Sequence, residues 1–244
     1  MIPKVLVTND DSVHSKGLLE LVIRLKKYAK EIMIVAPTRE KSAVSHSITI
    51  RRGLKLHQLP DLVEGVPTYS VEGTPADCVK VAKIALGFDF DVAFSGVNDG
   101  LNMADDVMYS GTVAGAAEAV MFGKVGIAVS VKRNGLEALE NGFDMVMDYF
   151  QKNNLLEGNL FFNVNIPENA LGIQLAHQTK IATETKFKLQ EGLHYMIGDP
   201  DRKTKLEDQL GDVATYFKGY ISVTPLTNNR TDYQVLSSLT QKNK

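Results

Sequence analysis

Residues 5–12 read VLVTNDDS, and this stretch decides the architecture that we predict for the chain. A short run of strand-forming residues leads directly into two adjacent carboxylates, Asp10 and Asp11. In an open α/β sheet, ligands bind in the crevice beyond the carboxyl ends of the strands, so the pair is expected at the mouth of a site. Two neighbouring like charges are unfavourable unless a cation or strong donors compensate them.

Such a carboxylate pair has two interpretations. Hard oxygen ligands suit a divalent cation such as Mg²⁺ or Mn²⁺, which favours a metal site. Alternatively, one aspartate caps the following helix and the other is solvated, because turns often carry Asp. Spacing alone leaves both interpretations open.

The segments that follow predict a Rossmann-like sheet. Residues 17–28 form an amphipathic helix, whose apolar face carries Leu18, Leu21, Val22 and Leu25. Residues 32–36 form a second apolar strand that ends at Pro37. A strand–helix–strand unit of this length needs a right-handed parallel crossover. The remaining expected strands are 48–56, 90–94, 125–131 and 160–166, and the remaining expected helices are 75–86, 114–122 and 136–150. We therefore predict an α/β fold, a Rossmann-like three-layer sandwich with a mostly parallel sheet.

The pattern changes from about Ile173. Short β-like stretches alternate with charged spacers such as residues 203–208. We predict a core over 1–172 and a β-rich C-terminal extension over 173–244, which completes the site or forms an oligomer interface. Basic residues in the extension (Arg202, Lys203 and Lys205) are interspersed with acids, so we interpret them as a solvated face.

Composition limits the class of protein. The chain has 244 residues, 44% of them hydrophobic and 23% charged, with a net charge of −2. This balance is ordinary for a globular protein and gives no basic footprint for a stable nucleic-acid partner. The single cysteine, Cys78, excludes an intramolecular disulfide and is expected in the core. Without a signal-peptide pattern or a membrane-length apolar run, we expect a cytoplasmic enzyme or binding protein.

Three further segments carry candidate chemistry. The loop 38–47 holds Ser42, whose hydroxyl is a suitable ligand for phosphate or metal, although such loops are often merely solvated. Residues 95–102 read SGVNDGLN. The glycines let the backbone come close to a ligand, and the asparagine amides supply neutral oxygen ligands. Ser110, Gly111 and Thr112 begin a helix of small residues, where free N–H groups favour an anion. Ordinary capping is the alternative, and it is credible for Thr112 alone.

The motifs, taken together, resemble the survival protein SurE family. The matching blocks are VTNDD at 7–11, VAP at 35–37 followed by Ser42 and HSIT at 46–49, GTPADCV at 73–79, SGVN at 95–98, YSGTV at 109–113, NVNIP at 163–167 and SVTPL at 222–226. They occur in the family's order and span nearly the whole chain.

The resemblance implies a metal-dependent nucleotidase that hydrolyses nucleoside 5′- and 3′-monophosphates, with one Mg²⁺ or Mn²⁺ per subunit. It also implies a Rossmann-like core and a C-terminal extension exchanged within a homodimer or a larger homo-oligomer such as a tetramer. The implied metal ligands are Asp10, Asp11, Ser42 and Asn98, and the two aspartates are also the implied catalytic residues. The implied phosphate-binding residues are Ser110, Gly111 and Thr112, with Asn9 and Asn102 as further site residues.

Two positions depart from the family's pattern. Ser12 and Ala104 stand where glycine is usual. Ser12 is expected to restrict a turn and Ala104 to stiffen a loop, because glycine tolerates backbone conformations that other residues do not. Since neither change removes a ligand, we expect an altered rate or selectivity rather than loss of activity.

Two other classes of protein share parts of this pattern. A Rossmann dehydrogenase or transferase is disfavoured because the first loop lacks G-x-G-x-x-G and its carboxylates would repel a pyrophosphate. A non-catalytic nucleotide-binding protein would bind nucleotide without metal-dependent turnover, and retention of every expected ligand argues against it. The sequence leaves open whether an aspartate or a water molecule attacks phosphorus.

Overall fold

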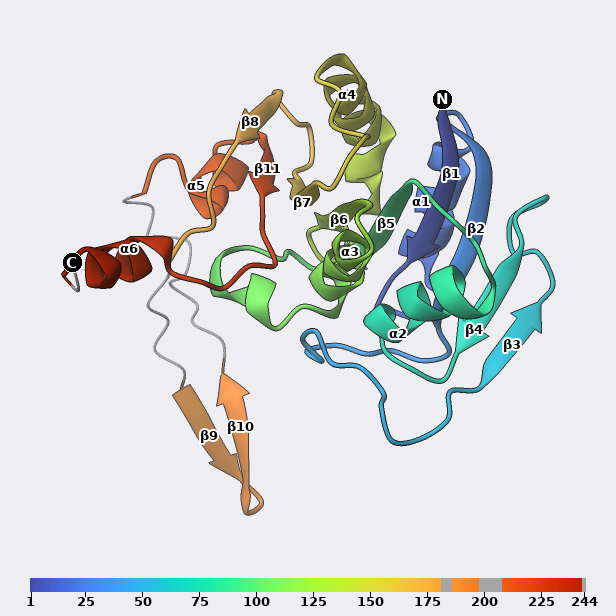
Figure 1. Cartoon of the computed structure of the whole chain (residues 1–244), viewed down its shortest axis with the longest axis horizontal. Helices are drawn as coiled ribbons and strands as arrows, with labels where there is room; N and C mark the ends of the chain where they lie inside the picture. Colours follow the sequence, from blue (N-terminus) through green and yellow to red (C-terminus); the bar gives the residue numbers. More distant parts are fainter. Residues whose placement is uncertain (181–185, 198–207, 243–244) are drawn as a thin grey trace.

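A nine-stranded sheet organises the computed structural model, which describes residues 1–180, 186–197 and 208–242 (Figure 1). Its strands stand in the order β3-β4-β2-β1-β5-β6-β7-β11-β8. Their bounds are β1 (Ile2–Thr8), β2 (Ala29–Pro37), β3 (Leu56–Leu59), β4 (Thr68–Val71), β5 (Val92–Asp99), β6 (Val125–Val131), β7 (Phe161–Ile166), β8 (Ile173–Leu175) and β11 (Ile221–Pro225). The strands from β4 to β7 are parallel, while β3 and β11 run antiparallel to their neighbours β4 and β7. The predicted mostly parallel sheet is confirmed.

The chain reverses its direction of travel across the sheet at β1. It moves from β1 through β2 to β4, and then returns to the other side of β1 as β5. Register places Val7 beside Ile34 of β2 and Thr8 beside Ser95 of β5. Such a reversal opens a crevice at the carboxyl ends of the strands. The crevice lies directly beyond Thr8, where the Asp10–Asp11 pair begins.

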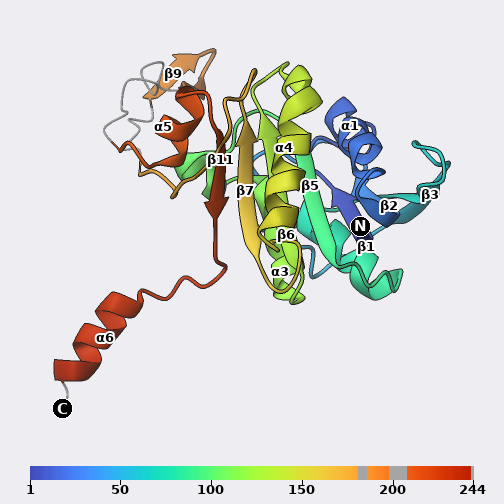
Figure 2. The ribbon, with the colours of Figure 1, turned by 90° about the horizontal axis from the view of Figure 1, so that it is seen from above.

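Helices cover both faces of the sheet, as predicted for a three-layer sandwich (Figure 2). Helices α1 (Lys16–Leu25) and α4 (Leu139–Lys152) bury their apolar stripes on one face. Helices α2 (Pro75–Lys80) and α3 (Gly111–Met121) pack on the other. The start of α2 is fixed by a reciprocal cap, in which Thr74 accepts from the Asp77 N–H and the Asp77 carboxylate accepts from the Thr74 N–H. Cys78 is fully buried, as expected.

Three expected elements differ in the structure. Residues 48–55 form no strand, because the backbone N–H and hydroxyl of Thr49 both donate to the Asp77 carboxylate at 2.8 Å. The predicted helix 75–86 is α-helical only to Lys80 and continues as a π-helix (η1, Val81–Ala85), whose wider turn leaves Ile84 70% exposed. The strand predicted at 90–94 begins at Val92 and extends to Asp99.

The C-terminal extension contains helices as well as strands. Strands β8 and β11 join the main sheet, whereas β9 (Lys186–Gln190) and β10 (Leu193–Ile197) form a separate antiparallel hairpin. Helix α5 (Asp212–Phe217) packs beside β11, and α6 (Tyr233–Lys242) lies apart from the body (Figure 2). The basic residues Arg202, Lys203 and Lys205 lie outside the described residues. Within the described chain, no helix combines the length and hydropathy needed to cross a membrane.

Candidate active site

Asp10 is the most deeply placed carboxylate at the crevice. It follows the end of β1 and is only 5% exposed. The hydroxyl of Thr112, at the start of α3, donates a hydrogen bond to its Oδ1 atom. Burial raises the pKa of Asp10 to about 6; the hydrogen bond from Thr112 opposes this rise, and the charge of Asp11 adds to it. None of the ion pairs formed by the described residues includes Asp10, so its charge has no counter-ion among them.

Asp11 is half-buried and faces two further acids. Its Oδ2 atom accepts a hydrogen bond from the Asp99 N–H at 3.4 Å. Burial raises the pKa of Asp11, the hydrogen bond from Asp99 lowers it, and the charges of Glu40 and Asp99 raise it further. The crevice therefore concentrates negative charge supplied by β1, β5 and the loop after β2.

The loop after β2 is tied to Asp10 by its backbone. The N–H of Lys41 donates to the Asp10 carbonyl at 2.7 Å, which brings Ser42 to the crevice. Ser42 is exposed, and its hydroxyl donates to the Glu40 carboxylate at 2.6 Å. Its predicted role as a metal ligand requires the hydroxyl oxygen to turn from Glu40 towards the aspartates.

Asn98 is the second-to-last residue of β5 and pairs with Ser130 of β6. It was predicted in a loop beyond the strand, so its predicted placement was wrong. The ladder between β5 and β6 is irregular between Ser95 and Asn98. The Asn98 side-chain N–H donates to the Gly100 carbonyl at 2.6 Å. In the described part of the chain, its Oδ1 atom accepts no hydrogen bond and remains available to a ligand.

These residues fit a hard divalent cation in their chemistry. The described residues include no group of three or more His, Cys, Asp or Glu side chains that could hold a metal, so a cation here would need neutral oxygens beside the two aspartates. Ser42, from the loop after β2, and Asn98, near the end of β5, supply neutral oxygens on either side of β1. The raised pKa values of Asp10 and Asp11 are those of desolvated carboxylates without a compensating positive charge.

The start of α3 closes one side of the crevice. Ser110 caps the helix by accepting from the Val113 N–H at 3.0 Å. A Cβ atom added to Gly111 would lie 2.9 Å from the Asp10 side chain, so only glycine permits this approach. Thr112 is fully buried and its hydroxyl is engaged by Asp10. Its predicted contact with phosphate would therefore have to use the backbone.

Asn9 and Asn102 are engaged in supporting hydrogen bonds. The Asn9 amide donates to the Ser12 carbonyl at 2.9 Å and to the Ser15 hydroxyl at 2.7 Å, which shapes the turn before α1. Asn102 is buried, donates to Ser130 at 2.9 Å, and is held through its backbone by Asn165. Both residues position site loops in this structure, and their contact with substrate stays a prediction.

Ser12 and Ala104 both adopt positive φ angles, 94° and 52° respectively. Residues with a side chain are strained in this region, and glycine is not. Both positions therefore have a backbone geometry that glycine adopts without strain, and the expected effect on rate or selectivity stays a prediction.

A charged cluster beside the crevice was missed by the sequence reasoning. The imidazole of His46 contacts the carboxylate of Glu118 at 2.8 Å, and Lys80 contacts the same carboxylate at 2.6 Å. The available signal was Glu118 itself, the only charged residue in the helix GTVAGAAEAVM. A single charge on a helix of small, buried residues requires a partner.

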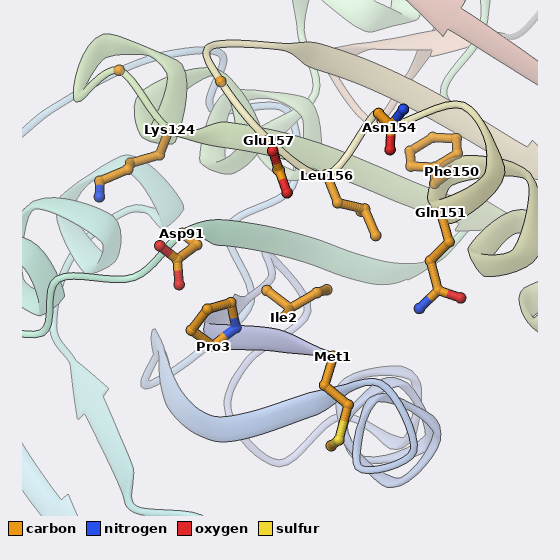
Figure 3. Close-up of a pocket in the computed structure, with 12 residues that line it drawn as sticks. Met1, Ile2, Pro3, Asp91, Lys124, Phe150, Gln151, Asn154, Leu156 and Glu157 are labelled. Atoms are coloured by element: carbon orange, nitrogen blue, oxygen red, sulfur yellow. The ribbon is translucent and has the colours of Figure 1, made fainter.

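A cavity that contains none of the crevice residues lies at the opposite end of the strands. It measures about 730 Å³, and Met1, Ile2 and Pro3 line it across from the turn that follows α4 (Figure 3). None of the predicted site residues lines it. A second cavity of about 330 Å³ includes His46 and Ser110 and therefore adjoins the crevice.

Comparison with known proteins agrees with the motifs and the fold. A family model described as survival protein SurE matches residues 5–187. A protein named 5′-nucleotidase SurE from Caldanaerobacter subterraneus subsp. tengcongensis is 36% identical, covering 96% of this chain and 95% of its own. Another of that name from Citrifermentans bemidjiense is 37% identical, covering 97% of both chains. The crystal structure of SurE protein from Aquifex aeolicus superposes with a TM-score of 0.80 at 30% identity, covering 99% of this chain and 100% of that one.

Proposed function

The chain belongs to the survival protein SurE family, and we propose that it is a metal-dependent nucleotidase that converts nucleoside 5′-monophosphates, and also 3′-monophosphates, to nucleoside and phosphate. The observation that carries this proposal is the pair Asp10 and Asp11, desolvated and without a cationic partner among the described residues, at the reversal point of the sheet. The names of the similar proteins support the 5′-nucleotidase activity.

We assign Asp10, Asp11, Ser42 and Asn98 to one Mg²⁺ or Mn²⁺ ion per subunit. When bound, such an ion polarises a phosphoryl oxygen and makes water more acidic. Asp10 is fixed in place by Thr112, whereas Asp11 is more exposed. We therefore assign Asp11, the more exposed of the two, to orient the attacking water.

The start of α3 would bind the phosphate. The first backbone N–H groups of a helix have no partner within the helix, and the helix dipole favours negative charge there. Gly111 lets this helix end approach Asp10 closely. Because phosphoryl transfer depends mainly on positioning and electrostatic stabilisation, donors at this place would stabilise the charge on the equatorial oxygens.

We also propose that the protein is a homo-oligomer. Helix α6 exposes Tyr233, Val235, Leu236 and Leu239, each at least half exposed, and it stands apart from the body of its own chain. The hairpin β9–β10 exposes further large apolar side chains. Apolar faces of this kind are covered in interfaces, and a second copy of this chain is the expected partner.

The test is release of phosphate from a panel of 5′- and 3′-mononucleotides, with EDTA or with added Mg²⁺ or Mn²⁺. Metal-dependent release that is lost in Asp10→Ala is the expected result. Nucleotide binding without release under any of these metals would contradict the proposal and indicate a binding protein.

A further inference from the structure

His46 and Glu118 form a pair that the chemistry above does not use. The Nε2 atom of His46 lies 2.8 Å from Oε2 of Glu118, and the Glu118 side chain is 3% exposed. The Nζ atom of Lys80, on α2, lies 2.6 Å from the other carboxylate oxygen. Burial raises the pKa of Glu118, but the hydrogen bonds from His46 and Lys80 more than offset this and hold it below its usual value. Glu118 is therefore an anion that holds the His46 ring in place through its Nε2 atom.

The pair lies beside the proposed phosphate site. The N–H of Ser45 donates to the Tyr109 carbonyl at 2.9 Å, which anchors the loop of His46 next to Ser110. His46 and Ser110 both line the cavity of about 330 Å³ that runs along α3. Apolar side chains such as Val113 and Ala117 form its floor, and Asn228 and Arg230 contribute polar groups. Its size and lining suit a small organic ligand.

We propose that His46 is the general acid that protonates the leaving nucleoside oxygen, and that the cavity along α3 holds the nucleoside. This inference rests on the proposed function, because it concerns the leaving group of the same reaction. The continuity of the cavity with Ser110 selects the nucleoside as its occupant, since the phosphate and the nucleoside of one substrate must occupy adjoining sites.

The proton balance of the step is simple. Water attacks phosphorus, the ester P–O bond breaks, and the electron pair goes to the nucleoside oxygen. That oxygen takes the proton from Nδ1 of the His46 imidazolium, while Nε2–H stays donated to Glu118. Neutral His46 then takes a proton from solvent, and the proton of the attacking water leaves with solvent or the phosphate product. An alkoxide is a poor leaving group, so this proton transfer accelerates the step.

The experiment compares two substrates that differ in one bridging atom. A nucleoside 5′-monophosphate needs its leaving oxygen protonated, whereas the analogue with bridging sulfur at the 5′ position departs as a thiolate, which leaves without a proton. We expect His46→Gln to lower kcat on the oxygen substrate by about 100-fold and to change kcat on the sulfur substrate by less than about 3-fold. Glu118 is a positioning residue. Glu118→Gln should also lower kcat selectively on the oxygen substrate, but by a smaller factor than His46→Gln.

Asp10→Ala separates the two proposals, because it should abolish hydrolysis of both substrates. If the wild-type chain hydrolyses neither substrate, the nucleotidase proposal fails. If the wild type is active and His46→Gln loses both substrates equally, or loses neither, the general-acid assignment is overturned. His46→Gln alters a partly exposed side chain on a loop, and retained hydrolysis of the sulfur substrate would itself report an intact fold and phosphate site.

Discussion

The hydroxyl of Thr112 donates a hydrogen bond to the carboxylate of Asp10, which lies 102 residues earlier in the chain. This contact joins the start of α3 to the end of β1. It fixes the orientation of the carboxylate and stabilises its charged form, since a hydrogen bond to an anion lowers its pKa. The proposed metal site and phosphate site are thereby held together by one side-chain contact.

Replacing Thr112 by valine should weaken the site while preserving its shape. Loss of a hydrogen bond to a charged group costs about 1.5–3 kcal/mol, so metal affinity and kcat/KM should fall by roughly 10- to 100-fold. The pKa of Asp10 should rise above its value of about 6, which moves the acidic limb of the activity profile to higher pH. Metal titration and steady-state kinetics measure both effects. Thr112→Ser keeps the hydroxyl and should stay near wild type; equal loss in both variants would contradict the explanation.

The metal-free protein should lose stability as pH rises from about 4 to about 6. Asp10 has a folded-state pKa of about 6, above the ordinary aspartate value of 3.8, so the folded state holds its proton more tightly than the unfolded state. Stability from this group is present below pH 4 and is lost through pH 6, by on the order of 3 kcal/mol. Denaturant unfolding in EDTA, compared between wild type and Asp10→Asn, measures the difference.

Asp144→Asn is the control of opposite sign for this experiment. Burial raises the pKa of Asp144, but the hydrogen bonds from Tyr28 and Lys27 and the nearby positive charges together lower it below its usual value. The contribution of Asp144 to stability is therefore present above its unfolded-state pKa and is lost as pH falls. If the difference in the free energy of unfolding between wild type and Asp10→Asn does not change with pH, Asp10 is not the cause of the loss of stability.

Gly111→Ala should disable the site through a steric effect. The added Cβ would lie 2.9 Å from the side chain of Asp10 and 3.0 Å from the Lys41 carbonyl oxygen. Displacing the carboxylate by a fraction of an ångström to about 1 Å should lower kcat by on the order of 100-fold. Gly100→Ala is the matched control, because its Cβ would meet only the Asn98 amide at 3.6 Å. Wild-type kinetics in Gly111→Ala would show that the close approach is not needed.

Ser12→Gly should stabilise the protein. Ser12 has φ of 94°, where a side chain is strained, and relief of that strain exceeds the entropic cost of glycine by about 1 kcal/mol. Thermal unfolding should therefore shift to higher temperature. Ser12→Ala removes the hydroxyl but keeps the strain, so it should bring no gain. A stabilisation shared by both variants would point to the side chain rather than the backbone.

Charged substitutions on α6 should dissociate the proposed oligomer. Leu236→Asp and Leu239→Asp alter side chains that are 50% and 54% exposed within one chain, so they should leave the folded subunit intact. Light scattering after size-exclusion chromatography should show a smaller species than wild type. Ser237→Asp places the same charge at a neighbouring exposed position and should have less effect. An unchanged mass in the double variant would exclude α6 from the interface.

Local sequence patterns determined much of this protein. The alternation of apolar strands with amphipathic helices predicted the three-layer sandwich, because burial of one face of each element requires that arrangement. The helix expected from residue 75 does begin at Pro75, because its start is fixed by capping contacts between residues only three apart. The polar segments at strand ends indicated the crevice, because parallel strands deliver their carboxyl ends to the same edge of a sheet.

The tertiary structure alone decided which partners the polar groups took. Thr112 turned out to hold Asp10, and Thr49 to hold Asp77 instead of extending a strand. His46 met Glu118 across 72 residues, which no local pattern contains. Periodicity and capping report interactions between residues close in sequence, whereas the choice of a hydrogen-bond partner depends on which surfaces packing brings together and which charges it removes from water.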